Sequence, residues 1–248
     1  MFVMDAMLAA TATAEDRHFW FKGLRRAARL MLDAELHGRQ LDHILDCGCG
    51  TGRNLDWLKD HGTAAGVELS SIGLAVARAH GRRVIQGSVT HLPIADASID
   101  LATSFDVLYC LPDAAERMAL DEMSRVLRPK GLALFNVAAL DILHGSHSAL
   151  TMEVRRYTPA RVRARLTAAG FEVVRLTFTN FATFPLTLAV RWSDRMRGKA
   201  TTASTSDLAV SAAPVNVALD LALRAEALSM RMINLPVGSS ILCLARKR

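Results

Sequence analysis

The chain lacks the cysteine pattern typical of zinc sites. Its 248 residues contain four cysteines: Cys47 and Cys49 are separated by one residue, and Cys110 and Cys243 are distant in sequence. No Cys-x-x-Cys pair exists, and the histidines have no supporting set of metal ligands. We therefore expect no metal site, and we expect a reduced, cytoplasmic location.

Long hydrophobic runs are also missing. No segment approaches the roughly 18 to 20 apolar residues that a membrane-spanning helix needs. Residues 1–14 are apolar, but they have neither a basic leading region nor a long uninterrupted apolar stretch, so they do not resemble a signal peptide. We predict no transmembrane segment and leave a peripheral membrane contact open.

Positive charge is in excess but is not concentrated. Lys and Arg number 30 against 24 Asp and Glu, which gives a net charge of +6 and a pI of about 9.5. This balance could favour a nucleic acid, an anionic membrane or an acidic substrate. A nucleic-acid footprint would be a concentrated basic patch, so nucleic acid is a disfavoured partner. The dispersed arginines are Arg25, Arg26, Arg29, Arg82, Arg83, Arg161, Arg163 and Arg165.

The chain does contain alternating strand-like and helix-like segments. With 51% hydrophobic residues it can bury one substantial core. The alternation predicts an α/β fold with a largely parallel sheet and helices on both faces. The expected strands are 43–47, 64–69, 83–86, 99–104, 132–137, 173–179 and 241–245, and the expected helices are 54–60, 71–80, 114–127 and 159–169.

A glycine-rich turn follows the first expected strand. The sequence Asp46-Cys47-Gly48-Cys49-Gly50-Thr51-Gly52 places three glycines at alternate positions after an acid. Glycine allows a sharp bend and lets the backbone approach a ligand closely. The spacing fits neither the dinucleotide pattern Gly-x-Gly-x-x-Gly nor a phosphate loop ending in Gly-Lys-Ser/Thr. It resembles motif I of the class I S-adenosylmethionine (SAM)-dependent methyltransferases.

Four later features extend this resemblance. Glu68 ends the second expected strand, where an acid for the ribose hydroxyls is expected in doubly wound sheets. Residues 86–93 resemble the loop that holds adenine, with Ser88 where many members have an aspartate. Residues 96–111 resemble the fourth-strand segment, and residues 125–132 resemble the turn into the fifth strand of the type 11 branch.

The N-terminal block at residues 15–26 is more distinctive. It reads Glu15-Asp16-Arg17-His18-Phe19-Trp20-Phe21 and continues to Arg25-Arg26. This block resembles the opening of a bacterial subset of the type 11 enzymes. In that setting an arginine could pair with the methionine carboxylate of SAM and an aromatic face could contact its sulfonium. The alternative is an amphipathic helix that simply packs on the domain.

The resemblance implies a Rossmann-like class I methyltransferase fold, with seven mostly parallel strands and the last strand antiparallel. It also implies SAM as the cofactor and S-adenosyl-L-homocysteine as its product. The cofactor-binding residues that it implies are Asp46, Cys47, Gly48, Gly50, Asn54, Glu68, Leu69, Ser88, Val89, Ser104, Phe105, Trp20 and Arg26.

Two nucleic-acid subclasses are disfavoured by the fourth-strand segment. Amino-methylating enzymes acting on adenine or glutamine carry an Asn/Asp/Ser-Pro-Pro-aromatic motif, whereas this chain has Ser104-Phe105-Asp106-Val107. Cytosine C5 enzymes need a Pro-Cys nucleophile, whereas Cys110 is followed by Leu111-Pro112. The expected acceptor is therefore a small or amphiphilic metabolite.

Candidate proton acceptors lie on the loop after the fifth strand and beside the fourth. They are His144, His147, Tyr109 and Glu153. Histidine titrates near neutral pH and can act as a general base, although histidines on surface loops are commonly inert. Relatives in the bacterial subset carry an aspartate and a histidine where this chain has Ser148 and Glu153.

The expected organisation has four parts. Residues 1–40 form an N-terminal helical cap, 41–179 the SAM-binding core, 180–238 an amphipathic insertion, and 239–248 the final strand of the core. The insertion could serve as a substrate lid, a dimer contact or a membrane contact. The predicted function is methyl transfer by direct in-line displacement, by a monomer or homodimer. The alternatives are a noncatalytic SAM-binding or regulatory subunit and an RNA methyltransferase.

Overall fold

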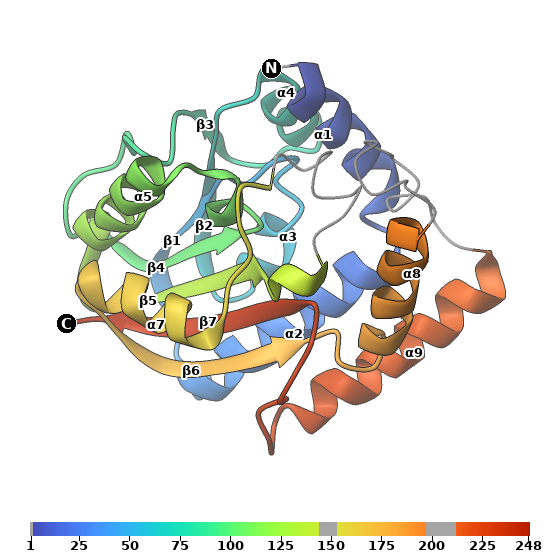
Figure 1. Cartoon of the computed structure of the whole chain (residues 1–248). Coiled ribbons are helices and arrows are strands. Elements are labelled where there is room, and N and C mark those ends of the chain that lie inside the picture. The colour runs from blue at the N-terminus through green and yellow to red at the C-terminus, as the bar shows by residue number, and fades with distance from the viewer. Residues whose placement is uncertain (1, 144–152, 197–211) are drawn as a thin grey trace.

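The computed structural model describes residues 2–143, 153–196 and 212–248 (Figure 1). Its strands are β1 (Leu41–Cys47), β2 (Gly62–Glu68), β3 (Val84–Gln86), β4 (Ile99–Phe105), β5 (Leu127–Ala138), β6 (Phe171–Thr179) and β7 (Ser240–Lys247). Its helices are α1 (Phe2–Ala14), α2 (Phe19–Leu36), α3 (Leu55–Leu58), α4 (Ser71–Ala79), α5 (Asp113–Val126), α7 (Pro159–Ala168), α8 (Phe184–Met196) and α9 (Ala213–Ser229). Two short 3₁₀ helices are η1 (Leu108–Cys110) and η2 (Asp141–Leu143).

The strands form one sheet in the order β3-β2-β1-β4-β5-β7-β6. β1 to β5 pair in parallel, and β7 lies antiparallel between β5 and β6. The predicted seven-stranded, mostly parallel sheet with an antiparallel last strand is therefore confirmed. Since the strand order reverses direction between β1 and β4, a crevice is expected beyond the carboxyl ends of these two strands.

Local sequence signals explain several boundaries. The Thr158 hydroxyl accepts from the Arg161 amide, Pro159 occupies the first turn of α7, and Gly170 follows the helix at φ +84°. The Ser70 hydroxyl likewise caps α4. The interior strands β4 and β5 are buried on both faces, as strands in the middle of a parallel sheet require.

Among the elements whose bounds differ from the sequence prediction, α3 and β5 have a clear local cause. α3 covers only Leu55–Leu58, because the chain around it runs through single turns rather than a continued helix. β5 starts at Leu127, five residues before the expected start at 132. Its pairing with β4 shifts register after Leu127, and Lys130 adopts φ +64°, so the Arg-Pro-Lys-Gly turn forms a bulge at the start of the strand.

Helices cover both faces of the sheet. Figure 1 shows α5 and α7 in front of it and α2 behind it. α9 packs along α2, so that a Cβ on Gly23 would lie 2.5 Å from Leu223 Cδ1. Lys22 and Arg26 of α2 form ion pairs with Asp220 of α9. α9, which falls in the expected insertion at 180–238, thus packs against the N-terminal helix α2.

Within the described part of the chain, no helix combines the length and apolar character needed to cross a membrane.

Candidate functional site

The glycine turn lies directly after β1 and has an unusual backbone. Gly48, Gly50 and Gly52 adopt φ values of +77°, +56° and +74°, a region that side chains other than glycine rarely occupy. A Cβ on Gly48 would come within 2.5 Å of Val107 Cγ2. The turn therefore passes against the segment that follows β4, at the edge where the strand order predicts a crevice.

Asp46 is buried at the end of β1, with 1% of its surface exposed. Its Oδ1 accepts a hydrogen bond from the Thr103 hydroxyl at 2.6 Å. Its Oδ2 is buried without a hydrogen bond of good geometry, and the Asn54 amide is the polar group that faces it. Burial raises the pKa of Asp46 to about 7, and the Glu68 carboxylate adds to the rise.

Glu68 ties the turn to the start of α4. One carboxylate oxygen accepts from the Gly50 amide at 2.7 Å, and the other accepts from the Ser70 amide at 2.7 Å. A carboxylate has about four acceptor positions, so these two bonds leave capacity for further donors. The structure thus brings Glu68, Asp46 and the glycine turn together, as the sequence predicted.

The N-terminal helix α1 closes over this turn. Leu8 is buried, and a Cβ on Gly50 would lie 3.2 Å from its Cδ2. Both carboxylate oxygens of Glu15 accept from the Thr51 hydroxyl, at 2.9 and 2.8 Å. Burial raises the pKa of Glu15, which is consistent with a carboxylate that is sealed against the turn.

The other predicted residues of the N-terminal block lie on α2. Arg26 donates to Asp220 of α9 at 3.2 Å, while its second terminal nitrogen is buried without a hydrogen-bond partner. The Trp20 ring meets the Phe21 ring edge-on at 5.0 Å and packs against the core. Their roles in binding the methionine part of SAM stay predictions.

The predicted adenine-side residues border the same edge of the sheet. Leu69, just after β2, is 58% exposed. The Ser88 hydroxyl bonds to the Thr90 hydroxyl at 2.8 Å and accepts from the Thr90 amide, so it stabilises its own turn. Val89 is half-buried against the core. Asn54 precedes α3 and accepts from the Trp57 indole at 3.4 Å.

The predicted residues at the end of β4 lie next to the turn. Cys47, Ser104 and Phe105 are buried at the ends of β1 and β4. Tyr109 is buried on η1, and burial raises its pKa well above the ordinary value. Its role as a proton acceptor stays a prediction. His144 and His147 lie outside the described residues.

Glu153 forms an ion pair with Arg156, with 2.5 Å between Oε1 and Nε and a second contact of 3.0 Å. Arg156 also donates to the carbonyl of Ala139 at 3.1 Å. Through Arg156, the ion pair thus fixes the residues just before α7 against the end of β5. Whether Glu153 also acts as a base stays a prediction.

Asp106 is a candidate that the sequence reasoning did not single out. It follows β4 in the left-handed conformation, at φ +62°, and its Oδ1 accepts from the Asn136 amide of β5 at 2.8 Å. Burial raises its pKa to about 7, and the carboxylate of Glu153 contributes. Tyr109 and Cys110 are also close to Asp106, whose charge contributes to the raised pKa of both. The available sequence signal was an acid directly after a buried strand.

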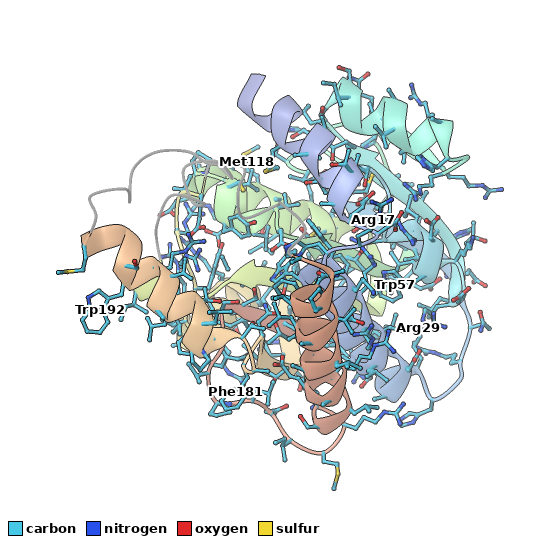
Figure 2. The ribbon with its side chains drawn as sticks, turned by 90° about the vertical axis from the view of Figure 1, so that its right-hand side faces the viewer. Arg17, Arg29, Trp57, Met118, Phe181 and Trp192 are labelled. Carbon is cyan, nitrogen blue, oxygen red and sulfur yellow. The ribbon has the colours of Figure 1, made fainter. Side chains whose placement is uncertain are left out.

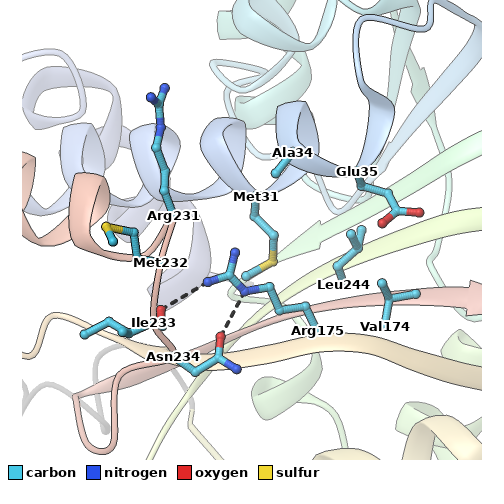
Figure 3. A pocket seen from close by; sticks show the side chains of 10 residues that line it. All are labelled: Met31, Ala34, Glu35, Val174, Arg175, Arg231, Met232, Ile233, Asn234 and Leu244. Carbon is cyan, nitrogen blue, oxygen red and sulfur yellow. Dashed lines mark hydrogen bonds between the residues drawn. The ribbon is translucent and has the colours of Figure 1, made fainter.

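A cavity of about 370 Å³ lies apart from the glycine turn (Figure 3). It is bordered by α2, β6, β7 and residues 231–234. Its Arg175 donates to the Asn234 side chain at 2.9 Å and to the carbonyls of Met230 and Ile233, so this cation holds the loop in place. α2 leads into the amino end of β1, so the cavity lies toward the edge opposite the glycine turn.

Within the described ranges, no cluster of three or more His, Cys, Asp or Glu side chains is arranged to hold a metal ion. None of the four cysteines, which all lie in the described ranges, forms a disulfide bond, and burial raises the pKa of Cys47, Cys49, Cys110 and Cys243.

The chain is similar to known methyltransferases. A family model described as a methyltransferase domain, of the type 11 group, matches residues 45–135. A malonyl-[acyl-carrier protein] O-methyltransferase of Erwinia billingiae is 32% identical over 167 residues. The matched region covers 62% of this chain and 64% of that protein, so the chain spans just under two thirds of the length of this relative.

Solved structures share the fold. A Haloferax volcanii methyltransferase, in complex with the Trm112 methyltransferase activator, has a TM-score of 0.63 at 21% identity, covering 98% of this chain and 96% of that one. The Burkholderia thailandensis 1,6-didemethyltoxoflavin-N1-methyltransferase, with its substrate and S-adenosylhomocysteine bound, has a TM-score of 0.57 at 18% identity, covering 99% and 87%.

The seven-stranded sheet is the fold of the solved methyltransferases, and residues 45–135 match the methyltransferase domain of the type 11 group, which is a class of SAM-dependent enzymes. The family prediction is confirmed. The bacterial subset inferred from the N-terminal block stays a prediction.

Proposed function

We propose that this protein transfers a methyl group from SAM to a small or amphiphilic metabolite. The observation that carries the proposal is the arrangement of Asp46, Glu68 and the glycine turn at the carboxyl ends of β1 and β2. The buried Oδ2 of Asp46 without a good hydrogen bond, and a turn whose backbone has no Cβ at Gly48 and Gly50, fit a polar ligand that approaches the main chain closely.

When bound, SAM would supply a methyl group activated on a sulfonium: the acceptor would attack the methyl carbon in line while the carbon–sulfur bond breaks, and S-adenosylhomocysteine would leave. The protein then has three tasks: to orient the partners, exclude water and remove a proton when the acceptor carries one. Asp46 and Glu68 would hold the cofactor, and α1 would exclude water from the turn. Asp106 is the proton acceptor that we favour among the described residues, because its pKa of about 7 suits a general base near neutral pH.

Two features support a metabolite as the acceptor. The end of β4 carries neither the Pro-Pro motif nor the Pro-Cys nucleophile of the nucleic-acid subclasses. The Erwinia and Burkholderia proteins are described as acting on a malonyl-carrier conjugate and on a small heterocycle. A cytoplasmic location, and action as a monomer or homodimer, are part of the proposal. Four cysteines without a disulfide bond among them fit a reducing location.

The experiment combines binding with transfer. Isothermal titration with S-adenosylhomocysteine tests the cofactor site, and transfer of a labelled methyl group from SAM to a metabolite extract tests the reaction. We expect binding and label in the small-molecule fraction. Intact binding with no transfer to any extract would favour the noncatalytic subunit. Strong transfer to total RNA offered in parallel would replace the metabolite by RNA.

The base is tested by Asp106→Asn. With an acceptor that carries a proton, we expect turnover to fall by about 10² to 10⁴, while affinity for S-adenosylhomocysteine is kept. The wild-type rate should rise with pH through about 7, and this rise should be missing in the variant. Asp121→Asn, at an exposed position of α5, is the matched control. An unchanged pH profile in Asp106→Asn would exclude the role.

A further inference from the structure

An apolar groove opens between η2 and α8. Its volume is about 300 Å³, and the described residues that line it are Ile142, Leu188, Trp192 and Met196. None of these four side chains carries a charge. The volume is at the lower end of the range for small-molecule sites.

The groove lies beside the carboxyl end of β5, at the edge of the sheet where the parallel strands β1 and β4 also end. η2 begins three residues after β5 ends, and the Leu140 amide donates to the Tyr157 carbonyl at 3.1 Å. The next segment is joined to η1, because the Val154 amide donates to the Tyr109 carbonyl at 2.9 Å. Ile142 thus lies just after the carboxyl end of β5, and residues 154–157 link this end to η1, which begins two residues after Asp106.

α8 presents large apolar side chains toward solvent at this groove. Trp192 is 66% exposed and Met196 is 78% exposed. Figure 2 shows Trp192 projecting from α8 at the periphery, whereas Trp57 lies in the interior. Soluble proteins rarely expose contiguous apolar surface, and where they do, it commonly marks a site that binds a ligand or a partner.

We propose that this groove binds the alkyl chain of the methyl acceptor, which is therefore an amphiphile with an apolar chain and a polar reacting end. The inference rests on the proposed function. It follows from the position of the groove: a chain lying along α8 would leave its polar end at the carboxyl ends of β4 and β5, near Asp106. The apolar lining offers burial of methylenes and no hydrogen bonds to a polar group.

The test uses 1-hexanol, 1-octanol and 1-decanol as probes, titrated into the full-length protein. We expect affinity to rise about fourfold for each added methylene. Leu188→Asn should weaken octanol binding at least tenfold, since a polar amide would face the chain. Leu186→Asn is the matched control, because Leu186 lies on the same helix, is 55% exposed and does not line the groove.

A second arm identifies the source of the chain. Phosphatidylcholine vesicles are sedimented with wild type and Leu188→Asn. Sedimentation lost in the variant assigns the chain to a membrane lipid, and binding of the alcohols alone assigns it to a free amphiphile. Affinity independent of chain length, or equal losses in Leu188→Asn and Leu186→Asn, would overturn the proposal. Self-association that Leu188→Asn abolishes would replace the alkyl chain by a second copy of this protein.

Titration with S-adenosylhomocysteine separates this proposal from the proposed function. Leu188→Asn should keep wild-type affinity for it, because Leu188 lies outside the glycine-turn site. Alcohol binding without any cofactor binding would refute the methyltransferase proposal and leave the groove established as a site for apolar chains.

Discussion

Asp46→Asn should stabilise the protein at neutral pH while it removes cofactor binding. In the folded state, burial raises the pKa of Asp46 from 3.8 to about 7. The folded protein therefore binds this proton more tightly than the unfolded chain does. Its contribution to stability is fully present below pH 3.8, falls as the pH rises and is lost above about pH 7. Asparagine does not titrate, so the variant lacks this loss.

The structure sets the size of the effect. A shift of about three pKa units corresponds to roughly 4 kcal/mol at 1.36 kcal/mol per unit. Because a protein relaxes around a buried charge, we expect about half of this, roughly 2 kcal/mol, in the free energy of unfolding at pH 8. The asparagine Oδ1 can still accept from the Thr103 hydroxyl, so the substitution keeps that hydrogen bond. For a chain of this length the gain is roughly 4 to 8 °C in Tm.

The assay is urea unfolding of wild type and variant between pH 4 and pH 8, followed by tryptophan fluorescence. The stability difference should be near zero at pH 4, grow with pH and level off above pH 7. Titration with S-adenosylhomocysteine on the same samples should show that the variant no longer binds it. A gain in stability with a loss of function is expected where a ligand site holds a buried charge.

Asp100→Asn is the matched control with the opposite sign. Although burial raises the pKa of Asp100, the His43 amide and the Arg128 guanidinium lower it below its ordinary value. This carboxylate therefore stabilises the fold above pH 3.8, and its loss should destabilise the protein at pH 8. The reasoning would be refuted if the difference in the free energy of unfolding between Asp46→Asn and wild type were the same at pH 4 and pH 8. It would also be refuted if Asp46→Asn were less stable than wild type at pH 8.

Two further substitutions test the turn and its acid. Gly48→Val should abolish binding of S-adenosylhomocysteine and lower the free energy of unfolding by about 2 to 3 kcal/mol. A branched side chain is strained at φ +77°, and its Cβ would clash with the Val107 side chain. Wild-type affinity of this variant in calorimetry would contradict the assignment of the turn. Glu68→Gln should weaken cofactor binding by roughly 1 to 3 kcal/mol, whereas Glu122→Gln, which removes a similar carboxylate that accepts from the Leu92 amide at 2.7 Å, should leave it unchanged. If both Gln variants lowered cofactor affinity equally, Glu68 would have only a structural role.

The order of strands and helices could be predicted from the sequence because its signals are local. Short apolar segments between helical patterns predicted the positions of all seven strands. The start of α7 at Thr158-Pro159 and its end at Gly170 are set by contacts within one helical turn. The glycine spacing at 48, 50 and 52 likewise indicated the turn, since its left-handed backbone depends on residue type at each position. The final antiparallel strand came from family resemblance, because pairing between distant strands leaves little local trace.

The sequence by itself determined the elements, the turn and the acids that belong to it. Only the tertiary structure decided that Glu15 seals the turn through Thr51, that Arg26 pairs with Asp220, and that Asp106 is a candidate base. The first two contacts join residues 36 and 194 positions apart, and chain closure over such distances depends on the whole fold. The protonation of Asp106 depends on burial and on the nearby Glu153, and both exist only once the strands have packed.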